Sequence, residues 1–157
     1  MEKKASEIQK ERIQEIEDKA NILLDKCDTI TLASVNKSGY PRICYVSKLR
    51  SVGFSEIYIV TGKRSKYHGK VTHFENNTKA SVCYFIGGDS VTLIGNIEIV
   101  EDDNLKTELW RESDRRFFSK GTEDPKFRLL RFVTNEATFW IDGKFRTCTY
   151  KSKNKTP

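Results

Sequence analysis

The chain has 157 residues, of which 32% are charged, so it is long enough for one domain with its own hydrophobic core and too short for two. Its net charge is +6, but part of that excess lies in residues 151–157, which we expect to be a disordered basic tail after a single domain over residues 1–150. No DNA- or RNA-binding motif accompanies the remaining cations, so we rank nucleic-acid binding last.

The cysteines and the first residues indicate where the protein is found. Four widely spaced cysteines accompany only two histidines. A zinc site or a disulfide framework needs closer grouping, so we expect no metal and four free thiols: Cys27, Cys44, Cys83 and Cys148. The N-terminal stretch MEKKASEIQKER lacks the apolar core of a signal peptide, and no later run reaches membrane-spanning length. We therefore expect a cytoplasmic protein without membrane contact.

The first third of the chain predicts a helix and a hairpin. Apolar residues at helical spacing predict an amphipathic helix over residues 6–27. Strands at 29–35 and 40–49 follow, and the polar loop between them contains a glycine, which is typical of a β-hairpin. The second strand carries Arg42 among apolar residues. Its guanidinium either extends from an edge strand into water or faces an anionic ligand, and both interpretations stay open here.

A buried strand at residues 57–60 ends at Thr61 and Gly62, and a cationic stretch leading into a helix follows it. The stretch contains Lys63, Arg64, Ser65, Lys66 and Lys70 and no acidic residue. Free backbone N–H groups, hydroxyls and cations favour an anion, so we interpret this turn as a phosphate-binding site. Its spacing is not that of a P-loop. A solvated basic helix face is the alternative interpretation.

Another strand pair is predicted at residues 79–86 and 91–100. Gly95 interrupts its apolar face, which indicates a bend or the close approach of another element. Asp102 or Asp103 can cap the helix that comes next.

That helix carries apolar residues as far as Phe117. Strands are then predicted at 127–134 and 137–141, and an Asp-Gly turn at 142–143 leads into a last strand at 145–150. Short strands joined by hairpins, with helices at the margins, predict a mainly β fold: an antiparallel β-barrel with flanking helices.

The ordered strands resemble a known family in three segments: TLASVNKSGYPRICYVSKL, EIYIVTGKRSKYHGKVTHFENNTKASVCYF and DSVTLIGNIEIVED. They are similar to the pyridoxamine 5'-phosphate oxidase-like FMN-binding split barrels, in particular the general stress protein 26 branch. The later pieces LWRESDRRFF, DPKFRLLRF and ATFWIDG fit the same branch. The resemblance implies a six-stranded antiparallel split barrel that forms a homodimer and holds FMN in clefts at the subunit interface.

The resemblance also implies which residues contact the cofactor. Along the flavin it places four residues of the second strand: Arg42, Ile43, Cys44 and Tyr45. At the phosphate it places a threonine, a serine and a lysine of the cationic turn, which correspond to Thr61 with Gly62, Ser65, and either Lys66 or Lys70. The turn is longer than in most of the branch, so both lysines remain candidates.

The activity that the resemblance implies is FMN-dependent oxidoreduction of an unassigned small molecule, with a reduced nicotinamide as donor. True pyridoxamine phosphate oxidases bind their substrate with an Arg-rich C-terminal segment that this chain lacks, so that reaction is not expected. In addition, Ser47 stands where the family has a lysine. Chemistry at a flavin ring needs no acid or base from the protein, so we name no catalytic residue. The alternative is a non-catalytic split barrel that binds flavin or haem for sensing.

Overall fold

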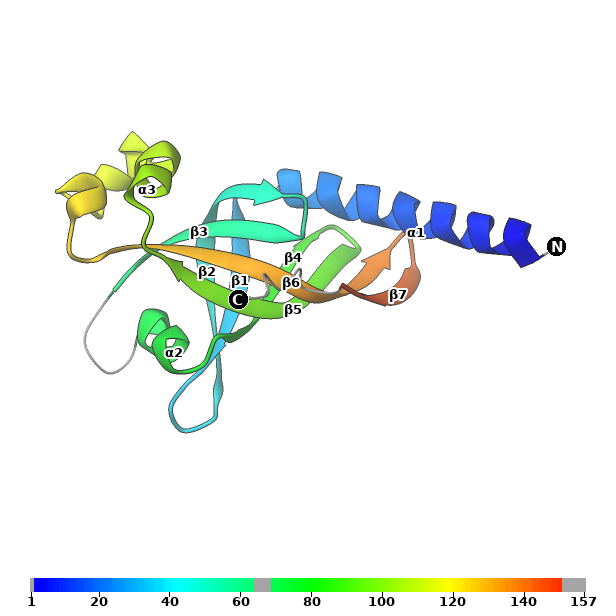
Figure 1. Cartoon of the computed structure of the whole chain (residues 1–157), viewed down its shortest axis with the longest axis horizontal. Helices are drawn as coiled ribbons and strands as arrows, with labels where there is room; N and C mark the ends of the chain where they lie inside the picture. Colours follow the sequence, from blue (N-terminus) through cyan, green and yellow to red (C-terminus); the bar gives the residue numbers. More distant parts are fainter. Residues whose placement is uncertain (1, 64–68, 151–157) are drawn as a thin grey trace.

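The computed structural model describes residues 2–63 and 69–150, and the predicted basic tail lies outside them. Seven strands and three α-helices form (Figure 1). In chain order the elements are α1 (Glu2–Asp25), β1 (Thr29–Val35), β2 (Pro41–Val52), β3 (Glu56–Gly62), α2 (Lys70–Asn76), β4 (Lys79–Ile86), β5 (Asp89–Val100), α3 (Asp103–Leu109), the 3-10 turns η1 (Glu112–Arg116) and η2 (Gly121–Glu123), β6 (Phe127–Ile141) and β7 (Lys144–Thr149).

The strands form one antiparallel sheet in the order β3-β2-β1-β4-β5-β6-β7. Pairing of β3 with the first half of β6 closes six of these strands into a barrel. The second half of β6 leaves the barrel and pairs with β7. The predicted mainly β fold, a six-stranded antiparallel split barrel with flanking helices, is therefore confirmed.

Alternation along β3 shows how the core is divided. Ile57 and Ile59 are fully buried in the main core inside the barrel. Tyr58 and Val60 point to the other side, where they pack in a smaller cluster with Phe118 beneath the segment that contains α3 and η1. Both sides of this strand are thus covered by apolar groups, which explains its continuous β-branched and aromatic sequence.

The strands predicted at 127–134 and 137–141 are one strand, β6. Its register with β5 shifts between Gly95, which pairs with Thr134, and Ile94, which pairs with Glu136. Asn135 is the extra residue of this β-bulge, so the polar stretch that suggested a break only bends the strand.

Gly95 has the close approach that its sequence position indicated. A Cβ added there would overlap the carbonyl oxygen of Val133 and lie 2.9 Å from Cζ of Phe132. We expect Gly95→Ala to lower the free energy of unfolding by about 1–3 kcal/mol, as overpacking does in rigid cores. Gly88→Ala is the matched control, because a Cβ there meets nothing within 4 Å. Equal urea midpoints for the two variants would contradict this account.

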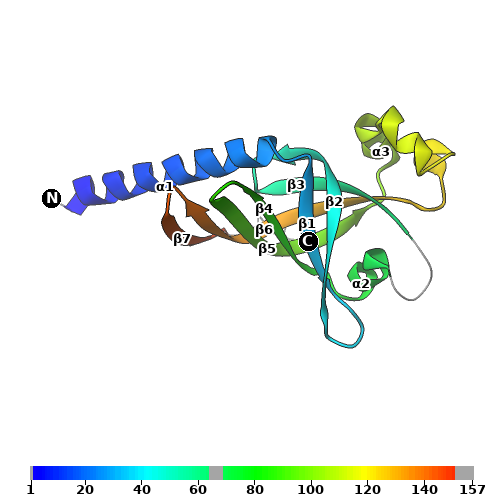
Figure 2. The ribbon, with the colours of Figure 1, turned by 180° about the vertical axis from the view of Figure 1, so that it is seen from behind.

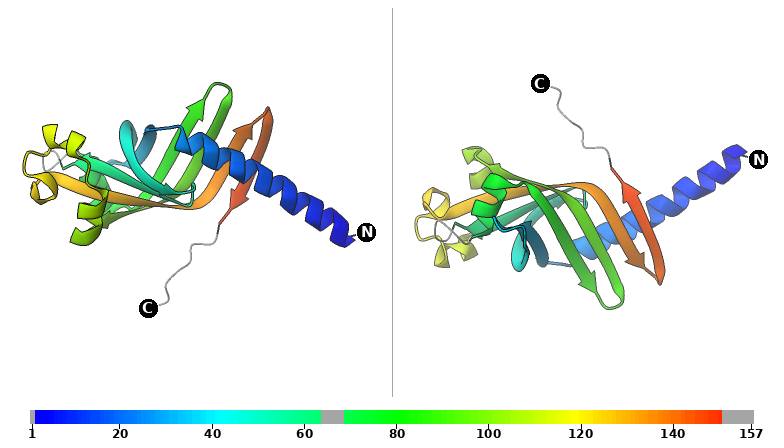
Figure 3. Two further views of the ribbon diagram at one scale, coloured as in Figure 1. Left: turned by 90° about the horizontal axis from the view of Figure 1, so that it is seen from above. Right: turned by 90° about the horizontal axis from the view of Figure 1, so that it is seen from below.

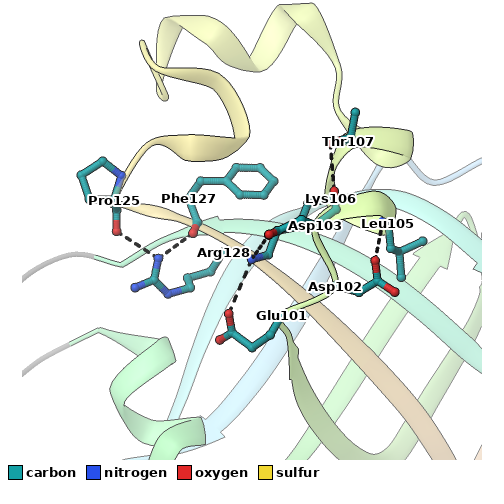
Figure 4. A network of polar contacts seen from close by, with 9 residues as sticks. All are labelled: Glu101, Asp102, Asp103, Leu105, Lys106, Thr107, Pro125, Phe127 and Arg128. Carbon is teal, nitrogen blue, oxygen red and sulfur yellow. Dashed lines mark hydrogen bonds and ion pairs between the residues drawn. The ribbon is translucent and has the colours of Figure 1, made fainter.

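The helix predicted to reach Phe117 ends at Leu109 instead. Asp102 caps it as expected, since its side chain accepts a hydrogen bond from the Leu105 N–H at 2.9 Å (Figure 4). Trp110 is extended, with φ −61° and ψ 135°, and packs edge-on against Phe127. The chain turns at Trp110, where the indole packs against the start of β6. A helix that continued through residue 110 would move the indole away from β6.

Helix α1 crosses one face of strands β4 to β7, and its first half continues beyond the sheet (Figure 3, left). Tyr84 on β4 donates a hydrogen bond to the carbonyl of Ala20 at 3.1 Å, and Lys19 pairs with Asp142 at 2.7 Å. Within residues 2–63 and 69–150, no helix is both long and apolar enough to cross a membrane.

Candidate functional site

A pocket of about 870 Å³ lies at one end of the barrel. Its lining comes from β2, the end of β3, the start of α2, the segment around η1 and Lys126 just before β6. The α3–η2 segment lies on one side of the end of β3 and the start of β6, and α2 lies on the other (Figures 1 and 2). Among its lining residues are four that the sequence placed at the cofactor: Tyr45, Thr61, Gly62 and Lys70. The strand end and the second strand therefore meet at one site.

The α2 side of the pocket is cationic. The ammonium of Lys70 donates a hydrogen bond to Oγ1 of Thr61 at 3.1 Å. Lys63 follows Thr61 by two residues and continues on the same side of the chain, and its N–H donates to the carbonyl of Lys126 at 2.7 Å. The closure of β3 on β6 thus brings three lysines into the lining of one pocket, Lys63, Lys70 and Lys126, of which Lys70 contacts the buried hydroxyl of Thr61.

Three carboxylates lie near these lysines. Asp124 accepts a hydrogen bond from the Lys126 N–H at 3.0 Å, and this bond and the charge of Lys126 lower the pKa of its carboxyl. Glu75 on α2 pairs with Lys63 at 2.6 Å. Asp114 lines the pocket, but Arg111 holds its carboxylate through two hydrogen bonds of 3.1 and 3.2 Å. No described carboxylate forms an ion pair with Lys70. The site therefore keeps an excess of positive charge that suits a dianion such as a phosphate monoester.

The η1 side of the pocket is aromatic. Phe118 is buried against Phe127, with ring centroids 5.2 Å apart, and lies in van der Waals range of Gly62. Phe117 and Tyr45 also line the pocket, and their side chains are 61% and 75% exposed. The pocket therefore presents a cationic end and an aromatic end to one ligand.

The other predicted contacts on β2 lie outside this lining. Cys44 points into the barrel beside Lys70, and burial raises the pKa of its thiol while the ammonium opposes that shift. Arg42 and Ile43 are exposed where β2 pairs with β1 but not yet with β3. Arg42 is thus exposed on a stretch of β2 that is paired on one side only, and the contact of its guanidinium with an anionic ligand stays a prediction. Ser65 and Lys66 lie outside the described residues.

Several lining residues were not among the predicted contacts: Val46, Ser47, Val60, Lys63, Asp114, Phe117, Phe118 and Lys126. Lys63 was visible in the cationic stretch, and Val46 and Ser47 directly follow Tyr45. Lys126 and the two phenylalanines carry no local signal, because they reach the site only through the pairing of β3 with β6 and the break after α3.

A cationic end beside an aromatic end fits a phosphorylated compound with a planar ring, held at the rim of a six-stranded split barrel. The fold and the pocket thus define a ligand-binding split-barrel protein. The chain belongs to the pyridoxamine 5'-phosphate oxidase family, whose model matches residues 16–141. Among curated protein sequences, no relative matches the chain.

Solved structures share this fold. A protein related to general stress protein 26 of B. subtilis (pyridoxinephosphate oxidase family), from Clostridium acetobutylicum, superimposes with a TM-score of 0.77 at 20% identity, over 86% of this chain and 94% of that one. General stress protein 26 from Bacillus anthracis str. Sterne gives 0.69 at 24% identity, over 85% and 98%. A heme binding protein from Mycobacterium smegmatis gives 0.68 at 14% identity, over 85% and 57%.

Proposed function

We propose that the protein is an FMN-binding oxidoreductase of the general stress protein type that works as a homodimer. The observation that carries this proposal is the two-ended pocket. FMN combines a dianionic phosphate with a planar ring, and the pocket combines the lysines of its lining with the exposed rings of Tyr45 and Phe117. Membership of the pyridoxamine 5'-phosphate oxidase family supports the same ligand.

The residues of the pocket divide the binding of FMN between them. Lys70 and the hydroxyl of Thr61, which already contact each other, are placed to share a phosphate oxygen. Strand β2 and the η1 side offer apolar and aromatic contact to the ring. The flavin supplies the electron-transfer chemistry when bound, with a reduced nicotinamide as the proposed donor. Asp114 is tied to Arg111, so the described lining offers no free carboxylate as a proton donor.

The homodimer is supported by the sheet face opposite α1, which we call the bare face. No described element covers it (Figure 3, right). Over residues 81–94 and 136–149 its outward positions are Ser81, Cys83, Phe85, Ser90, Thr92, Ile94, Glu136, Thr138, Trp140, Phe145, Thr147 and Thr149. On the other side of the β-bulge the same face carries Lys79, Asn96, Glu98 and Arg131. Over residues 81–94 and 136–149 only Glu136 among the outward residues is charged, whereas 32% of the whole chain is. A broad face with so little charge and several exposed aromatic rings is typical of a protein interface.

The bare face is continuous with the pocket. One register row crosses six strands through Tyr45, Thr31, Cys83, Thr92, Thr138 and Thr147. Every residue in that row is uncharged, and its first member lines the pocket. A second copy seated on the bare face would therefore approach the mouth of the pocket, which supports a cofactor cleft at the subunit interface.

Titration with FMN and with riboflavin tests the proposal. Riboflavin lacks the phosphate, and charge-assisted hydrogen bonds are worth roughly 1.5–3 kcal/mol each. We expect riboflavin to bind about tenfold to a hundredfold more weakly than FMN in isothermal titration calorimetry. Bleaching of the bound flavin by NADH or NADPH under anaerobic conditions tests the oxidoreductase part. Equal affinities for the two flavins would contradict the phosphate site.

Haem binding is the second candidate, because a structural neighbour is a heme binding protein. It predicts an intense absorption band near the ultraviolet edge after haem is added, and no discrimination between FMN and riboflavin. Lys70 and Lys126 suit the propionates of haem as well as the phosphate of FMN, so the comparison of FMN with riboflavin is the measurement that separates the two candidates.

A further inference from the structure

Phe117 is an exposed aromatic residue that the protein holds in a fixed place. Its neighbour Phe118 is only 6% exposed, whereas Phe117 is 61% exposed. Their N–H groups both donate to the carbonyl of Asp114, at 2.9 and 3.1 Å. Asp114 is in turn held by Arg111. The backbone at Phe117 is therefore anchored by the buried ring beside it, and the exposure of Phe117 is a defined feature of this turn.

The start of β6 anchors the same wall. Arg128 donates hydrogen bonds to the carbonyls of Pro125 and Phe127, at 2.9 and 2.7 Å (Figure 4). Phe127 then packs edge-on against both Trp110 and Phe118. The segment that presents Phe117 is thus packed against the barrel, and it can position a ligand.

The strand register places Phe117 away from the phosphate end. Val60 pairs with Ser47 and packs in the cluster that contains Phe118, so Ser47 and Tyr45 lie on the outer side of β2. Thr61 points to the opposite side, toward Lys70. A ligand whose phosphate lies at Lys70 must therefore cross the end of β3 to reach Tyr45 and Phe117.

We propose that Phe117 is a positioning residue that stacks on the ring of the bound cofactor; this inference rests on the proposed function. The guanidinium of Arg116 lies over one face of the Phe117 ring, 4.6 Å from its centroid. Phe117 is still 61% exposed, so part of its ring surface is open to a planar ligand. Stacking at that face fixes where the flavin ring lies, while the lysines fix where the phosphate lies.

The proposal predicts a loss of binding affinity that does not depend on the phosphate of the ligand. Phe117→Ala should weaken FMN and riboflavin by the same factor, about tenfold, because both ligands carry the ring. Phe117→Leu keeps an apolar side chain without a ring. Its affinity for both flavins should lie between that of Phe117→Ala and that of the unchanged protein. Phe117→Trp should restore affinity and lower the fluorescence of bound FMN, because a stacked indole quenches excited flavins by electron transfer.

Calorimetry and fluorescence on the full chain separate the two proposals. If FMN binds, but Phe117→Ala leaves both affinities within twofold and Phe117→Trp leaves the fluorescence unchanged, the stacking role is overturned and the FMN site stands. If Phe117→Ala weakens FMN alone, Phe117 acts on the phosphate and the stacking role is overturned as well. If the unchanged protein binds neither flavin, the proposed function itself has failed.

Discussion

Thr92→Lys should convert the proposed homodimer into a monomer. Thr92 is exposed at the centre of the bare face, between Cys83 and Thr138 in the register row. Seating a second copy there would bury one unpaired ammonium from each chain, and each such burial costs several kcal/mol. We expect the dissociation constant of the dimer to rise by about a thousandfold or more. Light scattering at micromolar concentration measures the change in mass.

The same variant should lose most of its affinity for FMN, because the cleft is proposed to include the second copy. Thr107→Lys is the matched control, since Thr107 is an exposed threonine on α3, away from the bare face. It should leave both mass and FMN affinity unchanged. Thr92→Lys should still fold, since its side chain is exposed in one copy, and its thermal midpoint should fall only by the stabilisation that dimerisation contributes. A monomeric unchanged protein, or a dimer that survives Thr92→Lys, would refute this interface.

Lys70→Ala should weaken FMN binding by about tenfold to a hundredfold and leave riboflavin binding nearly unchanged. The reason is geometric: Lys70 already contacts the hydroxyl of Thr61 at 3.1 Å, and no described carboxylate neutralises it. The phosphate of FMN loses its second charge below about pH 6. Its affinity should therefore fall as the pH drops through that range, while the affinity for riboflavin stays constant.

Glu75→Gln provides a control in which FMN affinity should rise instead of fall. Its carboxylate pairs with Lys63 at 2.6 Å, so removing the charge frees that lysine for the phosphate. FMN should then bind a few times more tightly, in keeping with the modest energy of an exposed pair. Lys66→Ala tests the other lysine that the sequence left open. A larger loss in Lys66→Ala than in Lys70→Ala would assign the phosphate to Lys66.

Local sequence patterns were sufficient for most of the strands and turns. The first strand of the barrel occupies residues 29–35 as its alternation predicted. Asp142 and Gly143 both have positive φ, 52° and 69°, as an Asp-Gly hairpin turn requires. Such features are readable because side-chain alternation and turn chemistry depend on residues next to one another in the chain.

The candidate site was only partly predictable for the same reason. Thr61, Gly62 and Lys70 lie close together in the sequence around one strand end, so the sequence alone located the cationic end of the pocket. Lys126 joins them because β6 pairs with β3 across more than sixty residues of chain. No local pattern specifies that partner, since any apolar strand of suitable length satisfies the edge of β3 equally well.

The aromatic end and the bare face were decided by tertiary structure alone. The sequence predicts that Phe117 is an apolar residue of a helix. In the structure that helix ends at Leu109, Trp110 packs on Phe127, and Phe117 is exposed. Beyond the β-bulge, strands β4 to β6 are apolar on one side and, except for Glu136, uncharged on the other, and the sequence does not show which side α1 will cover. The docking of α1 through Ala20 on Tyr84 settles it. Burial is a property of the assembled layers, so the uncovered face is known only after the helix is in place.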